Sequence, residues 1–183
     1  MVSTFPPPFA LRLRMGHPVR LCYSRRMMRI LMLLAALLAP AAAPAQQPPS
    51  VDAPAGARLI LAAKGEGVQI YSCSEGKWTL KAPDAKLLDA QGKVIGTHFA
   101  GPTWKLTDGS EVKGKLMAKR PSPEEGSVAW LLLEAVPDSG TGKMAGVAYI
   151  RRTETHGGAA PKEACGSGES RQPYTATYSF YAR

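Results

Sequence analysis

Short runs of alternating apolar and polar residues, interrupted by glycine and proline, follow one another from residue 58 to the end of the chain. In the run GVQIYSC (67–73), for example, Val68 and Ile70 alternate with Gln69 and Tyr71. An alternation with a period of two places successive side chains on opposite faces of a β-strand. No run combines the spacing of an amphipathic helix with helix caps. The pattern therefore predicts strands rather than helices.

Turn residues divide these runs into hairpins. Ala90-Gln91-Gly92 separates one pair of predicted strands, and Asp108-Gly109 separates the next pair. An Asp-Gly step is typical of a tight turn between antiparallel strands. The run 127–137 is almost wholly apolar, which indicates a strand buried on both faces. We therefore predict one all-β domain over residues 58–183, built as an antiparallel β-sandwich or barrel.

The last run, YTATYSFY (174–181), presents two different faces. Aromatic residues and one alanine alternate with hydroxyl-bearing residues, and the apolar set is Tyr174, Ala176, Tyr178 and Phe180. We expect this strand to be paired into the sheet of the domain.

The first 45 residues do not follow the strand pattern. Arginines, the last of them Arg29, precede the apolar run 30–38, and small residues ending in Ala43-Pro44-Ala45 follow it. This order is typical of a signal peptide, and it predicts cleavage after Ala45 and export to the periplasm or the medium. Translation starting at Met27 or Met28 would give a more compact leader. The apolar run is too short to span a bilayer, so we expect no membrane span after cleavage.

Cleavage changes the charge of the protein. The whole chain carries a net charge of +9, but six arginines and no acidic residue lie within 1–45, which leaves 17 basic and 14 acidic residues, or +3. The remaining 138 residues contain no long basic run, so nucleic-acid binding is not expected. The Pro/Ala-rich segment 46–57 predicts a flexible lead-in to the domain.

Two cysteines, Cys73 and Cys165, remain after cleavage. In an exported protein such a pair is typically oxidised, so we predict one disulfide between them. The alternatives are two separate thiols or half of a metal site, although no CxxC spacing supports a metal.

Several longer motifs occur in a characteristic order: GVQIYSC, GTHFAGPTW, DGSEVKG, VAWLLLEA, YIRRTETHGGAAP and YTATYSFY. In their order and spacing these pieces, from Gly67 to Tyr181, resemble a family of secreted bacterial and fungal proteins catalogued as domain of unknown function 3455. The resemblance implies a secreted single domain, and it implies no particular reaction.

Some fungal members of this family carry a malate dehydrogenase label, which this sequence does not support. Gly65 and Gly67 begin a GxGxxG-like pattern, but Ile70 stands in the place of the third glycine. No helix is predicted after it, so the βαβ unit that holds a pyrophosphate is missing. We therefore exclude an NAD-dependent dehydrogenase and expect no cofactor.

The stretch GTHFAGPTW (96–104) holds the strongest candidate for chemistry, His98. Asp108 is the nearest following carboxylate, and together they are the candidates for a hydrolase or a metal-dependent enzyme. No HxH, HExxH or other ligand spacing accompanies them, so no metal site is predicted. The alternative for His98 is a hydrogen bond to the backbone at a strand end.

Binding is better supported than catalysis. Tyr71, Trp78, His98 and Trp104 lie within a short span, and aromatic faces bind sugars and other flat apolar groups. The leading hypothesis is a non-enzymatic binding module for a carbohydrate or a small apolar ligand. The alternatives are an enzyme using His98 and a structural protein of the cell envelope, and both tryptophans pack equally well into a β-core. The sequence does not indicate an oligomeric state.

Overall fold

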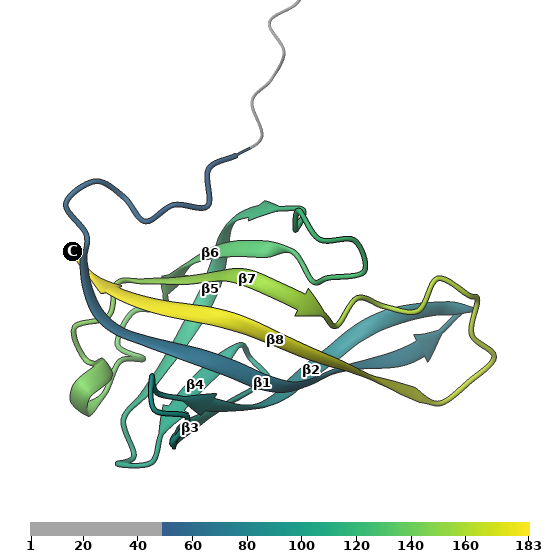
Figure 1. Ribbon diagram of the computed structural model, residues 1–183, viewed down its shortest axis with the longest axis horizontal. Coiled ribbons are helices and arrows are strands. Elements are labelled where there is room, and N and C mark those ends of the chain that lie inside the picture. Colours follow the sequence, from purple (N-terminus) through teal and green to yellow (C-terminus); the bar gives the residue numbers. More distant parts are fainter. Residues whose placement is uncertain (1–48) are drawn as a thin grey trace, which may run out of the picture. The chain divides into compact units, whose positions relative to one another are not determined.

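The structure is a computed structural model that describes residues 49–183, and the regular secondary structure of these residues is almost all β-strand (Figure 1). The strands of this part are β1 (Arg58–Ser74), β2 (Lys77–Leu88), β3 (Val94–Phe99), β4 (Thr103–Leu106), β5 (Glu111–Arg120), β6 (Trp130–Ala135), β7 (Tyr149–Gly157) and β8 (Glu169–Ala182). A single turn of 3₁₀ helix, Gly142–Met144, precedes β7. Among the described residues, no helix has the length and apolar character that crossing a membrane requires.

The strands form one closed, antiparallel barrel in sequence order, and β8 closes it by pairing with β1. This confirms the all-β prediction and shows that, of the predicted sandwich or barrel, the domain is a barrel. The predicted hairpin turns at 90–92 and 108–109 are also confirmed, because they join β2 to β3 and β4 to β5. In such a barrel, alternate connections lie at the same end. The β1–β2, β3–β4, β5–β6 and β7–β8 connections therefore share one end, and the other three share the opposite end.

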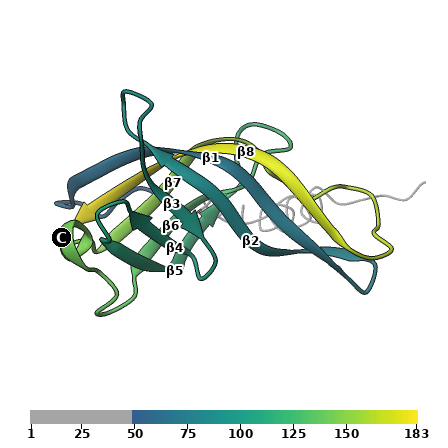
Figure 2. The ribbon, with the colours of Figure 1, turned by 90° about the horizontal axis from the view of Figure 1, so that it is seen from below.

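The barrel is much longer on one side than on the other. β1 has 17 residues and β8 has 14, whereas β4 has only 4. As a result, the tip of the β1–β2 hairpin and the beginning of β8 extend past the shorter strands (Figures 1 and 2).

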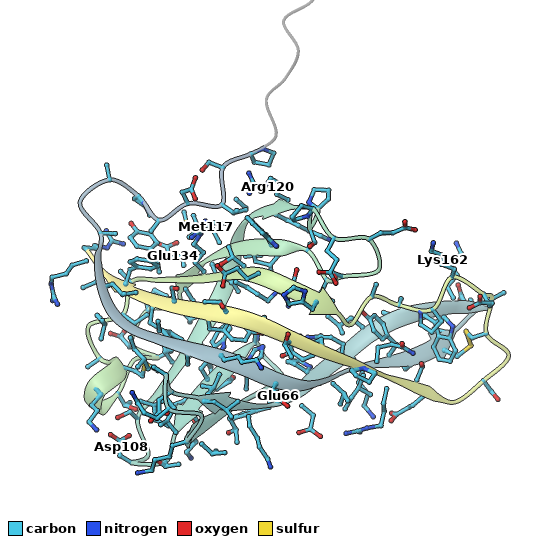
Figure 3. The ribbon with its side chains drawn as sticks, in the orientation of Figure 1. Glu66, Asp108, Met117, Arg120, Glu134 and Lys162 are labelled. Atoms are coloured by element: carbon cyan, nitrogen blue, oxygen red, sulfur yellow. A yellow bond between two sulfur atoms is a disulfide. The ribbon has the colours of Figure 1, made fainter. Side chains whose placement is uncertain are left out.

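The predicted disulfide joins Cys73 to Cys165 near the tip of this extension (Figure 3). Two backbone hydrogen bonds accompany it, from Cys73 N to Gly168 O at 2.9 Å and from Cys165 N to Gly76 O at 3.2 Å. Together these contacts attach the loop that precedes β8 to the β1–β2 hairpin.

β8 is paired into the sheet, as predicted, and its aromatic face points into the barrel. Tyr174, Ala176, Tyr178 and Phe180 are at most 3% exposed. Gly65 of β1 leaves room for the ring of Tyr178, because a Cβ atom there would lie 2.4 Å from Tyr178 Cε2. Gly65 therefore serves packing within a strand and not a phosphate-binding turn.

The segment before β1 is in contact with the barrel over part of its length. Val51 is 1% exposed, and Arg151 of β7 donates from Nε to Val51 O at 3.0 Å and from Nη2 to Asp52 Oδ1 at 2.7 Å. Residues 51 and 52 of the predicted flexible lead-in are therefore held by the domain. The predicted signal peptide, its cleavage site after Ala45 and the alternative starts at Met27 and Met28 lie outside the described residues.

Candidate functional site

A cavity of about 800 Å³ opens at the end of the barrel that carries the β3–β4 and β5–β6 connections. Residues 100–102, 121–122 and 124–129 of these connections form part of its rim. Apolar side chains, among them Leu80 and Leu116, lie at its edge and are about half exposed. The volume is in the range of natural small-molecule sites.

The inner wall of the cavity is a cluster of three aromatic rings. His98 and Trp104 are directly opposite each other in the β3–β4 ladder, and their rings stack with centroids 4.4 Å apart and planes inclined by 4°. Tyr178 meets both rings edge-on, at 5.1 and 5.6 Å. All three are at most 3% exposed. Their contacts fix the ring positions without any ligand.

His98 is a neutral imidazole with a defined tautomer. Its Nδ1 lies 2.8 Å from Thr103 O, and because a carbonyl can only accept, Nδ1 carries the proton and Nε2 is the acceptor nitrogen. Burial lowers the pKa of His98 to about 4, although the hydrogen bond to Thr103 partly opposes this shift. The contact with Thr103 O is the alternative that the sequence offered for His98, a hydrogen bond to the backbone at a strand end.

Two buried donors at the cavity have no acceptor among the described residues. They are Gln69 Nε2 and Trp104 Nε1. Gln69 is 1% exposed and lies beside the Tyr174 hydroxyl, but its Nε2 makes no hydrogen bond of acceptable geometry. An unsatisfied buried donor costs about 1–3 kcal/mol. An acceptor that enters the cavity would remove this cost.

Arg152 brings a positive charge into the cavity wall. It pairs with the inward-facing Tyr178 in the β7–β8 ladder, and its Nε and Nη2 donate to Ala129 O at 3.1 and 2.9 Å. Burial raises the pKa of Tyr71 and of Tyr178, and the guanidinium of Arg152 opposes this rise in both. The guanidinium therefore acts electrostatically on the polar groups of the cavity.

The structure brings three of the four aromatic residues proposed for binding to this cavity, namely Tyr71, His98 and Trp104. Tyr71 is 7% exposed and donates from its hydroxyl to Gly158 O at 2.7 Å. Trp78 does not line the cavity. It is half-buried and pairs with Cys73 in the β1–β2 ladder, next to the disulfide.

The two candidates for catalysis are not brought together. Asp108 lines a second cavity of about 590 Å³ at the opposite end of the barrel, and Figure 3 shows it far from Lys162 of the β7–β8 loop. Hydrogen bonds from Ser110 and then from Lys143 lower the pKa of Asp108 to about 2. Its neighbours are those of a turn aspartate, and they do not include His98. Within residues 49–183, no three His, Cys, Asp or Glu side chains gather as metal ligands would.

Sequence reasoning missed three residues of the cavity, Gln69, Arg152 and Tyr178, as contributors to a site. The only signal for Arg152 is its position two residues after Ile150, on the same face of a predicted strand. For Gln69 the signal is a polar residue that alternates with the apolar pair Val68 and Ile70. Neither signal distinguishes an inward side chain from a solvated one.

These features define a class of protein, an eight-stranded antiparallel barrel with an apolar cavity at one end and polar groups on the cavity wall. Barrels of eight strands have an interior that side chains fill or that holds one small ligand. The model of the family described as "Protein of unknown function (DUF3455)" matches residues 54–182, and the chain belongs to this family. No curated protein and no solved structure matches the chain.

Proposed function

We propose that the protein is an exported binding module that takes up a small, largely apolar molecule in the cavity beside His98 and Trp104. The observation that carries this proposal is the cavity of about 800 Å³ with two unsatisfied buried donors on its wall. Apolar groups at the mouth provide burial, while a few polar groups fix the orientation of a ligand.

A small apolar ligand fits this cavity better than a carbohydrate. Sugar binding by aromatic residues uses an accessible ring face. Trp104 is 1% exposed, and one of its faces is covered by His98. Burial of apolar surface would therefore supply most of the affinity, at about 25 cal/mol per Å².

Two features support the other parts of the proposal. The disulfide between Cys73 and Cys165 is typical of proteins that work in an oxidising compartment, such as the periplasm or the medium. A hydrolase that uses His98 with Asp108 is not favoured, because the two residues line cavities at opposite ends of the barrel.

The cavity can be tested by filling it. Leu131 is half-buried, lines the cavity and pairs with the inward-facing Arg152 in the β6–β7 ladder, so Leu131→Trp places a larger side chain inside the cavity. We expect the neutral apolar dye Nile red to gain fluorescence on binding the wild-type protein. Leu131→Trp should weaken this binding by about tenfold or more, because excluding roughly 60 Å² of apolar dye surface removes about 1.5 kcal/mol.

The matched control is Leu59→Trp, which makes the same change at an exposed leucine that lines neither cavity. This variant should bind the dye as the wild type does, and circular dichroism checks that both variants are folded. Equal binding by the two variants would show that the dye lies outside the cavity. Failure of the wild-type protein to bind the dye would contradict an apolar site.

A further inference from the structure

We infer that the ligand of this cavity carries an acidic group, a carboxylate or a similar anion, which binds at Arg152 while its apolar part lies toward the mouth. This inference rests on the proposed function and specifies the chemical class of the ligand. Three observations lead to it: the charge balance of the cavity, the excess of donors on its wall, and the position of Arg152.

The first observation is that the charges around the cavity do not cancel. Two ion pairs neutralise two of the charged residues that line it, namely Lys81 with Glu169 and Glu125 with Lys162. A third lining residue, Glu124, contacts His156, which is charged only if protonated. Lys119 and Arg152 also line the cavity, and neither forms an ion pair with a carboxylate in residues 49–183. With histidine counted as neutral, the charges left on the lining are those of Lys119, Arg152 and Glu124, and their net charge of 2 − 1 = +1 favours an anion.

The second observation is that the uncommitted polar atoms are mainly donors. Gln69 Nε2 and Trp104 Nε1 lack acceptors, and Arg152 uses two of its nitrogens on a single carbonyl oxygen, Ala129 O. A guanidinium has five N–H donors, so donors remain for a ligand. A carboxylate accepts up to about four hydrogen bonds and so complements this wall better than an alcohol or an amine.

The third observation is that Arg152 lies on the inner face of the barrel. Its neighbours in the two adjacent strands are Leu131 and Tyr178, which also line the cavity. The guanidinium is fixed by its hydrogen bonds to Ala129, so little side-chain entropy is lost when an anion binds. Hydrogen bonds to a charged partner are worth about twice those between neutral groups.

The experiment compares ligands of one chain length and different head groups. Decanoate, decanol and decylammonium compete with Nile red for the wild-type protein at neutral pH and low salt. We expect decanoate to bind about tenfold more tightly than decanol, and decylammonium to bind more weakly than decanol. This comparison needs no substitution, so it does not depend on the folding of a variant.

Arg152→Gln then removes the charge. In this variant decanoate and decanol should bind alike, whereas Arg171→Gln should keep the preference for decanoate. Arg171 is the matched control because it is exposed, pairs with Asp84 at 2.7 Å and lies outside the cavity.

The outcomes separate this inference from the proposed function. Two results would refute an acidic group that binds at Arg152 and would leave the proposed apolar binding site intact. One is that decanol displaces the dye from the wild type as well as decanoate does, and the other is that Arg152→Gln keeps the preference for decanoate. Displacement by none of the three ligands also overturns the inference. Failure of Nile red itself to bind overturns the proposed function.

Discussion

Replacing both Cys73 and Cys165 by serine should lower the free energy of unfolding by about 4 kcal/mol. The disulfide joins residues 92 positions apart, so it removes a large amount of chain entropy from the unfolded state. It also holds the loop before β8 against the β1–β2 hairpin. Since β8 closes the barrel on β1, loss of the disulfide weakens the pairing of the first strand with the last.

Urea unfolding of the two proteins without reductant measures this effect. A reductant should lower the stability of the wild type to that of the double variant and leave the double variant unchanged. A loss below about 1 kcal/mol would contradict this account, because such a value is well under the chain-entropy estimate for so long a loop.

Protonation of His98 alone should lower the free energy of unfolding by about 3 kcal/mol as the pH drops from about 6.5 to about 4. The folded state holds His98 neutral with a pKa of about 4, whereas in the unfolded chain the pKa has its ordinary value near 6.5. Between these values the unfolded state binds more protons, so acid favours unfolding. The stability that neutral His98 contributes is complete above a pH of about 6.5, and it is lost as the pH falls from there to about 4.

His98→Asn isolates this contribution, because the asparagine amide is able to donate to Thr103 O as Nδ1 does but does not titrate. The variant loses the ring stacking on Trp104, so it starts from a lower stability, but its stability should depend less on pH over this interval. His156→Gln is the control, since the His156 side chain is exposed and contacts Glu124. The same pH slope in wild type and His98→Asn would show that His98 is not buried as a neutral group.

The strands and their turns were predictable because the signals are local. Asp108-Gly109 has the turn chemistry of a tight hairpin whatever surrounds it, and Gly109 adopts a φ of +89°. The disulfide between Cys73 and Cys165 was predictable from the predicted export of the protein and from the presence of two cysteines after the cleavage site. Closure of the barrel was not predictable, because the pairing of β1 with β8 joins opposite ends of the domain and leaves no trace in a short window of sequence.

The site was predictable only in part, for a similar reason. His98 and Trp104 are near in sequence and meet across one hairpin. Gln69 and Arg152 meet the same cavity only because the pairing of β1 and β7 with β8 turns them inward.

In β1 the inward face carries Gln69 and Tyr71, while Val68 and Ile70 are half-buried on the other face, so alternation alone suggests the opposite assignment. Trp78 shows the converse error, an aromatic residue near the others in sequence but outside the cavity.

The most direct test of the central claim is to map where an apolar ligand binds. Addition of decanoate to isotope-labelled protein, followed by amide chemical shifts, should move the resonances of Gln69, His98, Gly101 and Gly126, which line the cavity beside Trp104. The resonances around Asp108 and Met144, in the cavity at the opposite end, should stay in place. Shifts confined to that second cavity, or to the outer face of the barrel, would contradict the account.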